Sequence, residues 1–226
     1  KDLPGTPNLF QLTKRILNLV PELKQLRLST IDCAEINTDF WPLLSEKRLM
    51  PYFHLSLQSG NDLLLKRMKR RHTRQQAIEF CRKVKKLRQE VVFGADLIAG
   101  FPTENEEMFA DSINLIKECN LTHLHIFPFS PRHSTPAARM PQVSTQVIKS
   151  RAKILRDCGK KNLSEYLNQQ IGKKAIMLVE KNDSTGSYGK SQHFTKIHID
   201  KELPKGLIVN CKIYKIKENI LQAKLI

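Results

Sequence analysis

The chain has 226 residues, which suits one large domain or a medium-sized domain with a small module. Its 38 lysines and arginines outnumber its 22 aspartates and glutamates. The resulting net charge of +16 favours a polyanionic partner, nucleic acid first, although a lysine-rich proteome would give the same excess. A hydrophobic content of 40% argues against wholesale disorder. The sequence contains no run of about 18 apolar residues, so we expect no membrane-spanning helix and no membrane partner.

The opening residues and the cysteines indicate the cellular setting. The opening segment KDLPGTPNLF lacks an initiator methionine and the basic-then-apolar pattern of a secretory signal, so we expect the chain to continue a longer polypeptide. The cysteines are far apart and form no CxxC pair, which predicts reduced thiols in a cytoplasmic protein and no cysteine-only metal site. They are Cys33, Cys81, Cys119, Cys158 and Cys211.

The first part of the chain alternates strand and helix patterns. Apolar runs predict strands at residues 26–32, 53–60, 91–100 and 121–129. Two capping boxes, Thr73 with Gln76 and Thr103 with Glu106, predict the starts of helices between these strands. This order is typical of βαβ units, so the predicted fold class is α/β with a parallel sheet.

The second predicted strand has one polar face. His54, Ser56 and Gln58 alternate with apolar residues, and successive side chains of a strand point to opposite faces. A parallel sheet covered by helices on both faces would be apolar throughout. The pattern therefore favours a barrel whose inner face meets a polar ligand, although an edge strand with a solvated face would show the same alternation.

The pattern changes after Pro141. Ser144 is expected to cap a long helix that ends near Gly172. Strands are then predicted at 175–180, 193–199, 207–215 and 219–226, with turns at 183–186 and 204–206, as in a small β-barrel. We therefore expect three parts: residues 1–142, a connecting helix at 143–171, and a barrel at 172–226.

Four long strings, in this order, resemble the radical S-adenosylmethionine (SAM) methylthiotransferases, closest to the branch that modifies threonylcarbamoyladenosine in transfer RNA. They are LRLSTIDCAEI, FHLSLQSGNDLLLKRMKRRHT, VVFGADLIAGFPTENEEMF and HIFPFSPRHSTPAARMPQV. The resemblance extends over the whole chain. It implies the second half of a partial (β/α)6 radical SAM barrel, followed by a small all-β barrel that resembles a TRAM domain.

The resemblance also implies a SAM site. The matching positions are His54, Ser56, Gln58, Ser59, Asp96, Gly100, Glu104 and Phe129. Read from the residues alone, the segment from Gly100 to Pro102 is equally a plain strand-to-helix turn, and Glu104 a first-turn carboxylate. No catalytic residue is assigned.

Basic residues suggest contacts with RNA. The run at 66–71 could bind phosphates, and the basic C-terminal module could stack bases on its aromatic residues. A solvated charged loop and a core of aromatic residues are the alternatives. The candidate RNA-binding residues are Lys66, Arg67, Lys69, Arg70, Arg71, Arg132, Lys190, His193 and Phe194. His123 and His125 share a strand face, but without a third ligand at suitable spacing we expect ordinary barrel residues and no metal site.

The resemblance implies radical chemistry, but this sequence lacks the cysteines that bind the iron–sulfur clusters in the family. Family members bind a four-iron four-sulfur (4Fe-4S) cluster through a CxxxCxxC loop and a second cluster through an N-terminal domain, and the present cysteines match neither set. We therefore expect a fragment, inactive alone, of an enzyme with SAM and two 4Fe-4S clusters whose ligands are not in this chain. The half-barrel is expected to expose a strand edge and to be prone to aggregation.

The implied reaction is methylthiolation at C2 of N6-threonylcarbamoyladenosine, at position 37 next to the anticodon of transfer RNA. The implied partners are the tRNA anticodon stem-loop, an electron donor such as a flavodoxin or ferredoxin, and the missing N-terminal half. The alternatives are a non-catalytic RNA- or SAM-binding remnant, and two other substrates of the family, isopentenyladenosine in tRNA or an aspartate of a ribosomal protein.

Overall fold

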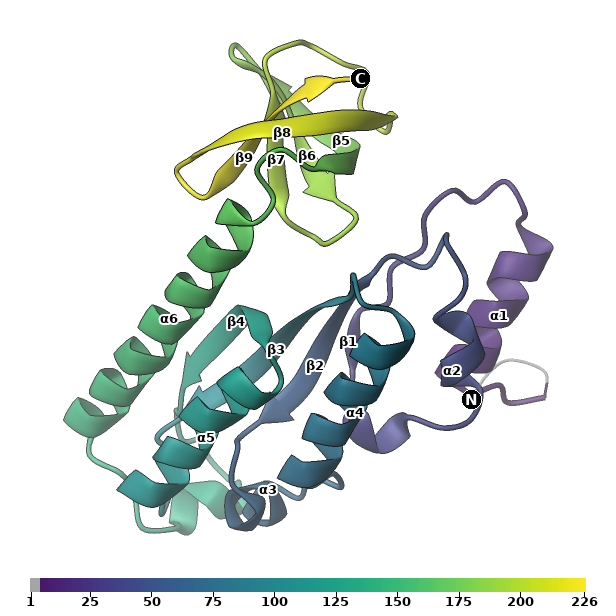
Figure 1. Cartoon of the computed structure of the whole chain (residues 1–226). Helices are drawn as coiled ribbons and strands as arrows, with labels where there is room; N and C mark the ends of the chain where they lie inside the picture. Colours follow the sequence, from purple (N-terminus) through teal and green to yellow (C-terminus); the bar gives the residue numbers. More distant parts are fainter. Residues whose placement is uncertain (1–4) are drawn as a thin grey trace. The chain divides into compact units, whose positions relative to one another are not determined.

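A computed structural model describes residues 5–226 (Figure 1). The chain divides into two compact units, Lys1–Leu155 and Arg156–Ile226, and the division falls within the long helix α6. The elements of the first unit are α1 (Leu9–Leu19), β1 (Thr30–Ile31), α2 (Phe40–Leu43), β2 (Tyr52–Gln58), α3 (Asp62–Arg67), α4 (Arg74–Leu87), β3 (Val92–Ala99), α5 (Glu106–Glu118) and β4 (Leu121–Pro128), with 3₁₀ turns at Cys33–Glu35 and Pro136–Arg139.

The first unit is a four-stranded parallel sheet in the order β1-β2-β3-β4. Helices α4 and α5 lie side by side on one face of the sheet (Figure 1). This confirms the predicted α/β class with a parallel sheet. Within residues 5–155, β1 and β4 form the two edges of the sheet. Unpaired backbone groups on such edges are the reason for the expected aggregation.

The first predicted strand, 26–32, is wrong in extent. Leu26 forms an isolated bridge with Leu49, whereas Thr30 pairs with His54, so the register changes by one residue between the two contacts. The residues between them therefore leave the ladder, and only Thr30–Ile31 form β1. The other three strands lie within two residues of their predicted bounds.

One of the two predicted capping boxes is correct. Thr73 and Gln76 exchange both hydrogen bonds at the start of α4. The second box is wrong, because α5 begins two residues later than Thr103 predicts. There Asn105 is the N-cap, and its side-chain oxygen accepts a bond of 2.8 Å from the Met108 backbone N–H. Thr103 instead has a φ of 69° in the preceding turn.

An aromatic cluster forms the core between the sheet and its helices. The Phe40 ring contacts the rings of Phe10, Phe53 and Phe80, with centroids 5.1, 5.5 and 5.4 Å away. Phe53 belongs to β2, so the apolar side of β2 faces the helices and its polar side faces away from them.

Helix α6 (Thr145–Asn168) begins where the sequence predicts. The Ser144 hydroxyl accepts a hydrogen bond of 3.3 Å from the Val147 N–H, as an N-cap does. The helix ends at Asn168, before Gly172, which has a φ of +83° and whose N–H donates to the Ile213 carbonyl. In the part of the chain that the structure describes, no helix is long and apolar enough to cross a membrane.

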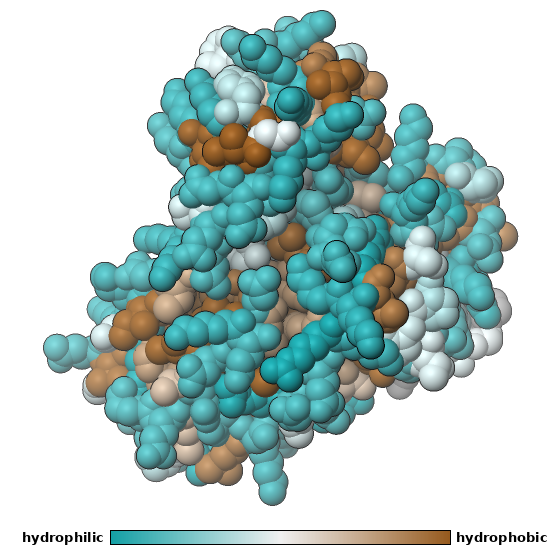
Figure 2. Space-filling view, viewed as in Figure 1, coloured by the Kyte–Doolittle hydropathy of each residue, from teal (hydrophilic) through white to brown (hydrophobic). Residues whose placement is uncertain are grey.

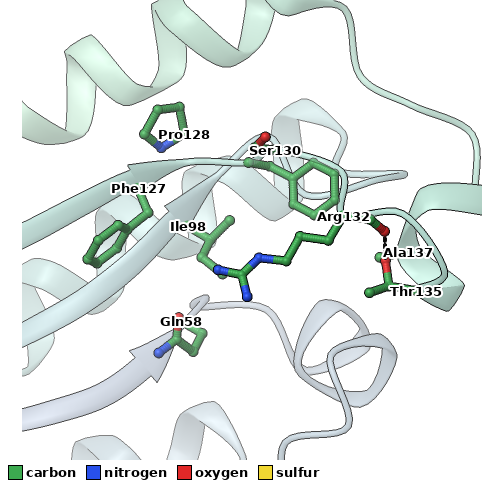
Figure 3. A pocket seen from close by; sticks show the side chains of 9 residues that line it. Gln58, Ile98, Phe127, Pro128, Ser130, Arg132, Thr135 and Ala137 are labelled. Carbon is green, nitrogen blue, oxygen red and sulfur yellow. Dashed lines mark hydrogen bonds between the residues drawn. The ribbon is translucent and has the colours of Figure 1, made fainter.

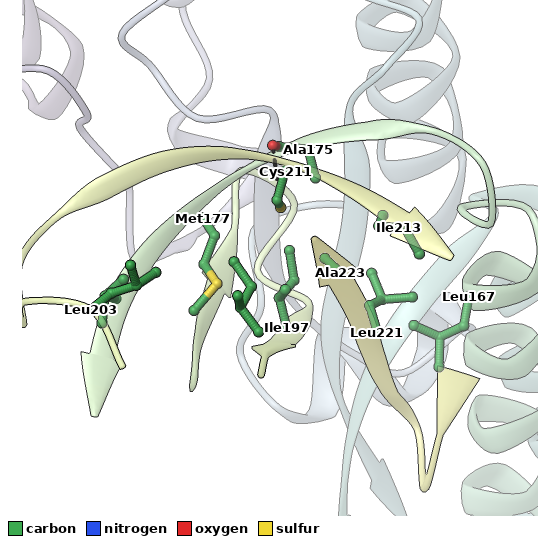
Figure 4. Close-up of a cluster of buried hydrophobic side chains, with 11 residues drawn as sticks. Leu167, Ala175, Met177, Ile197, Leu203, Cys211, Ile213, Leu221 and Ala223 are labelled. Carbon is green, nitrogen blue, oxygen red and sulfur yellow. Dashed lines mark hydrogen bonds between the residues drawn. The ribbon is translucent and has the colours of Figure 1, made fainter. Parts of the chain in front are cut away.

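The second unit contains a closed five-stranded barrel in the order β5-β6-β7-β9-β8, which confirms the predicted small barrel. Its strands are β5 (Lys174–Asp183), β6 (Gly186–Ser191), β7 (Lys196–Ile199), β8 (Ile208–Lys217) and β9 (Ile220–Leu225). All neighbours are antiparallel except β7 and β9, which pair in parallel. Alternate side chains fill the interior, among them Met177, Ile197, Ile213 and Leu221 (Figure 4).

The sequence prediction missed β6 and extended β7 too far. The β6 sequence GSYGKS carries no apolar alternation, so pattern alone gives no strand. Before β7, the Ser191 hydroxyl accepts bonds from the N–H groups of His193 and Thr195 and closes a turn. The predicted strand therefore begins at Lys196 rather than at His193.

Candidate functional site

Three neighbouring strands place polar side chains together on the face of the sheet away from the helices. His54 lies on β2, Asp96 on β3 and His125 on β4. Asp96 pairs in register with His125. One carboxylate oxygen, Asp96 Oδ1, lies 2.9 Å from His54 Nε2 and 3.2 Å from His125 Nδ1. We call these three residues the His-Asp-His cluster.

Tyr52 and Gly94 fix the orientation of His54. The Tyr52 hydroxyl lies 2.9 Å from His54 Nδ1, so both ring nitrogens of His54 contact protein groups. Burial raises the pKa of Tyr52 well above its ordinary value, so this hydroxyl stays protonated at neutral pH. A Cβ at Gly94 would lie 2.3 Å from the Tyr52 hydroxyl oxygen and 2.6 Å from His54 Nδ1. Only glycine leaves room for this pair.

A cavity of about 420 Å³ opens at the carboxyl ends of β2, β3 and β4 (Figure 3). Pockets of about 300–1,000 Å³ hold small ligands, and the carboxyl ends of parallel strands are their usual place in open α/β sheets. Arg132 extends its guanidinium past Ile98 toward Gln58 (Figure 3). The lining residues are Gln58, Ile98, Phe127, Pro128, Phe129, Ser130, Arg132, Thr135 and Ala137.

The cavity brings together three of the residues singled out from the sequence, Gln58, Phe129 and Arg132. Ser56 and Ser59 lie on the same stretch of chain but serve local contacts. The Ser56 hydroxyl accepts from the Gln58 side-chain amide at 2.9 Å, and the Ser59 hydroxyl accepts from the Asn61 N–H at 3.2 Å.

Gly100 and Glu104 form an anchor for α6 instead of lining the cavity. One Glu104 carboxylate oxygen accepts from the Gly100 N–H at 3.0 Å and from the Arg151 guanidinium at 2.8 Å. The side chains of Glu104 and Arg151 are only 1% and 6% exposed. A Cβ at Gly100 would lie 2.4 Å from Ile148 Cγ1, so glycine lets α6 approach. The sequence analysis missed Arg151, because nothing in its own helix marks it as a partner of Glu104.

Burial and hydrogen bonding act in opposite directions on Glu104. Burial raises the pKa of its carboxyl, while the Gly100 N–H and Arg151 lower it, and the net result is a raised pKa. The buried negative charge of Glu104 is therefore stabilised by the Arg151 guanidinium.

Much of the predicted RNA-binding run is held by protein groups. Arg67 bonds the Thr103 hydroxyl, and Arg71 pairs with Glu35. The Arg70 guanidinium lies 3.0 Å from the Asp32 carboxylate and 2.7 Å from the Ser56 carbonyl oxygen, so it joins β2 to the segment after β1. Lys66 and Lys69 are exposed.

His72 is buried, and its Nδ1 lies 3.4 Å from the same Asp32 carboxylate. Burial lowers the pKa of His72 below its ordinary value of 6.5. The unfolded chain therefore binds a proton at this position more readily than the folded chain, and stability falls as the pH drops below about 6.5.

We expect the free energy of unfolding to decrease as the pH falls below the ordinary histidine value of 6.5, and to decrease less in a His72→Gln variant. Trp41 is the only tryptophan, so its fluorescence in urea reports the first unit. A His133→Gln variant is the matched control, because His133 is exposed and should keep the wild-type pH dependence. If the His72→Gln variant kept the wild-type pH dependence, the loss of stability at low pH could not be assigned to His72.

The second unit presents lysines beside aromatic rings. Lys190 Nζ lies 4.2 Å from the centre of the Phe194 ring, and Lys215 and Lys224 flank Tyr214 at 5.5 and 5.4 Å. The His193 ring contacts Tyr166 edge-on. Hydrophilic side chains cover most of the visible surface (Figure 2). Exposed aromatic rings among cations can stack bases of single-stranded RNA.

The cysteines do not fit an iron–sulfur cluster. Burial raises the pKa of Cys33 to about 12 and that of Cys211 to about 11, which favours neutral thiols over the thiolates that bind iron. All five are free thiols. Within residues 5–226, no cysteine joins a group of three ligand atoms close enough to share a metal.

Comparison with known proteins gives relatives along the whole chain. The chain is 48% identical to threonylcarbamoyladenosine tRNA methylthiotransferase MtaB of Rickettsia prowazekii over 226 residues, which is 100% of this chain and 53% of that protein. It is 33% identical to MtaB of Aquifex aeolicus, over 76% of this chain and 42% of that protein. It is 30% identical to tRNA-2-methylthio-N(6)-dimethylallyladenosine synthase of Neorickettsia sennetsu, over 85% of this chain and 41% of that protein. The chain spans about half the length of the curated relatives it matches.

The fold comparison agrees with the sequence comparison. The structure of coproporphyrinogen III oxidase (HemN) of Escherichia coli, described as a radical SAM enzyme, matches 94% of this chain and 52% of its own, with a TM-score of 0.57. At 13% identity, this match shows the fold alone. The sequence profile of the Radical SAM superfamily matches residues 4–116, half of the chain. The chain therefore belongs to the radical SAM superfamily.

Proposed function

We propose that this chain is the C-terminal part of a tRNA methylthiotransferase that modifies C2 of N6-threonylcarbamoyladenosine. The observation that carries the proposal is the 48% identity to the Rickettsia prowazekii MtaB, because it extends over every residue of both units. The basic, aromatic surface of the second unit supports an RNA substrate. The proposed partners are the tRNA anticodon stem-loop, a flavodoxin or ferredoxin as electron donor, and an N-terminal half, in the cytoplasm.

The cavity at the strand ends fits SAM in size and chemistry. Phe127, 51% exposed, offers a ring face to an adenine. The Arg132 guanidinium can pair with the carboxylate of the methionine part, and the Gln58 amide can bond a ribose hydroxyl. Bound SAM would supply the radical that activates the substrate carbon, with one electron coming from the proposed electron donor. The lining residues of this chain would bind and orient it.

The five cysteines of this chain offer no ligand set for an iron–sulfur cluster. We propose that the ligands of the clusters come from residues outside this sequence. The purified chain is then expected to form no methylthiolated nucleoside by itself.

An Arg132→Ala variant should weaken SAM binding to the purified chain about tenfold, the effect of losing one charge-assisted hydrogen bond. Isothermal titration with SAM measures the change. Arg139→Ala is the matched control, because Arg139 is exposed nearby and does not line the cavity. Equal affinities of the wild type and Arg132→Ala would remove Arg132 from the site.

Gene disruption tests the substrate. Mass spectrometry of tRNA hydrolysates should show loss of the 2-methylthio form of threonylcarbamoyladenosine, while isopentenyladenosine keeps its methylthio group. The relative in Neorickettsia sennetsu makes the second nucleoside the alternative substrate. Loss of the methylthio group from isopentenyladenosine instead would overturn the choice of substrate. Unchanged tRNA would overturn the function and favour a non-catalytic remnant or the ribosomal-protein substrate.

A further inference from the structure

We infer that one outer face of the barrel in the second unit binds single-stranded RNA, with three lysines at its phosphates. The inference rests on the proposed function for the class of its ligand, and it names the surface that meets that ligand. Lys174 on β5 pairs in register with Lys212 on β8, and Lys212 pairs with Lys224 on β9. We call these three residues the lysine row. None of them is among the candidate RNA-binding residues that the sequence indicates.

The lysine row places like charges directly opposite one another. All three side chains are exposed. Opposite residues on antiparallel strands have Cβ atoms about 4.5–5.5 Å apart, and like charges placed in this way destabilise a sheet. Strands β8 and β9 contain no aspartate or glutamate that could offset the repulsion. A bound anion would offset it, whereas in the competing interpretation only water and salt screen the charges.

The dimensions of the lysine row suit a nucleic-acid backbone. Neighbouring strands are about 4.8 Å apart, so the row spans roughly 10 Å. Single-stranded RNA carries one negative charge per nucleotide, and each lysine ammonium is a point charge on a flexible stem that can reach successive phosphates. The row therefore favours a chain of linked phosphates over one isolated anion.

An aromatic ring lies on one side of the lysine row. Tyr214 follows Lys212 by two residues on β8, so both side chains point outward from the barrel. The Tyr214 side chain is 43% exposed, and Lys224 Nζ lies 5.4 Å from the centre of its ring. An exposed ring beside phosphate-binding cations can stack a base, which favours RNA over an acidic protein as the ligand.

A cavity of about 510 Å³ lies on the other side of the lysine row, and Lys174 is part of its lining. Ile176 pairs in register with Asn210, and the Ile226 N–H donates to the Asn210 carbonyl oxygen at 3.2 Å. Ile176 and Ile226 give the cavity apolar walls, and the Asn210 amide can bond the edge of a base. The face thus combines phosphate contacts with places for bases on both sides of the row.

Fluorescence anisotropy of the purified chain with a labelled oligouridylate of about 12 nucleotides tests the inference. The variant Lys174→Gln/Lys212→Gln/Lys224→Gln should bind at least about tenfold more weakly at about 0.1 M salt. The slope of log Kd against log salt concentration should fall by about 2, since each phosphate contact on a single strand contributes roughly 0.7. The variant should still fold, because it removes repulsion between exposed side chains.

The matched control removes the same charge elsewhere in the second unit. Lys160, Lys201 and Lys205 are exposed and lie outside the lysine row, so their replacement by glutamine should leave the affinity and the slope as in the wild type. Tyr214→Ala should weaken binding about tenfold without changing the slope, because stacking releases no counter-ions.

The inference is overturned if the folded wild type does not bind, if the lysine-row variant keeps the wild-type slope, or if the control variant loses as much affinity as the lysine-row variant. Binding of polyglutamate that depends on the lysine row, without binding of oligouridylate, would assign the face to an acidic protein and would also overturn it. Oligouridylate contains no threonylcarbamoyladenosine, so these results are independent of the tRNA analysis that tests the proposed function.

Discussion

Replacing Arg151 with methionine should lower the free energy of unfolding of the first unit by about 3–5 kcal/mol, the effect of removing one partner of a buried ion pair. The Glu104 carboxylate is 1% exposed and would remain inside the protein without its counter-ion. The loss should be larger at high pH. The folded-state pKa of Glu104 is already raised and would rise further, so stability decreases as the pH rises from the unfolded value through the folded one.

Urea unfolding followed by Trp41 fluorescence measures this change, because Trp41 lies in the first unit. The double variant Glu104→Gln/Arg151→Met should recover much of the loss, since it leaves no buried charge. Lys149→Met, at an exposed position of the same helix, should change the stability by less than about 0.5 kcal/mol. If Arg151→Met also changed the stability by less than about 0.5 kcal/mol, the Glu104–Arg151 pair would not be what holds α6 in place.

Replacing Gly189 with alanine should prevent the second unit from closing its barrel. The added Cβ would lie 1.9 Å from the Leu178 carbonyl oxygen and 2.8 Å from its carbon, and backbone atoms on a paired strand cannot move aside like the end of a flexible side chain. We expect the unit to lose more than about 4 kcal/mol, which is exceptional for one substitution.

Hydrogen exchange of peptides from 174–225 should show loss of protection, while Trp41 fluorescence continues to report a folded first unit. Gly172→Ala is the matched control. Gly172 has a φ of +83°, but an added Cβ would meet nothing within 4 Å, so the cost should be about 1–2 kcal/mol of backbone strain. Full protection in Gly189→Ala would show that β5 and β6 can separate without opening the barrel.

The sequence predicts what depends on local periodicity. The polar face of β2 follows from the alternation of His54, Ser56 and Gln58, and the start of α4 follows from Thr73 and Gln76. Both are set by side chains within a few residues of one another, where the period of the backbone fixes the geometry.

Contacts between distant strands and helices were not predictable in this way. His54 and Asp96 are 42 residues apart, and only the register of parallel strands brings them together with His125. The partner of Glu104 lies 47 residues away on α6. Strand β6 was missed because its residues show no apolar alternation, and its pairing with β5 and β7 on either side defines it as a strand.

The strand order of the barrel sets the order in which it can form during translation. Strand β9 is synthesised after the other four, yet it lies between β7 and β8 and pairs with both. Until β9 emerges from the ribosome, β7 and β8 each lack a neighbour, and two open edges are available to other nascent chains. A premature stop codon anywhere before Ile220 would therefore release a second unit that cannot close, however complete its first four strands are.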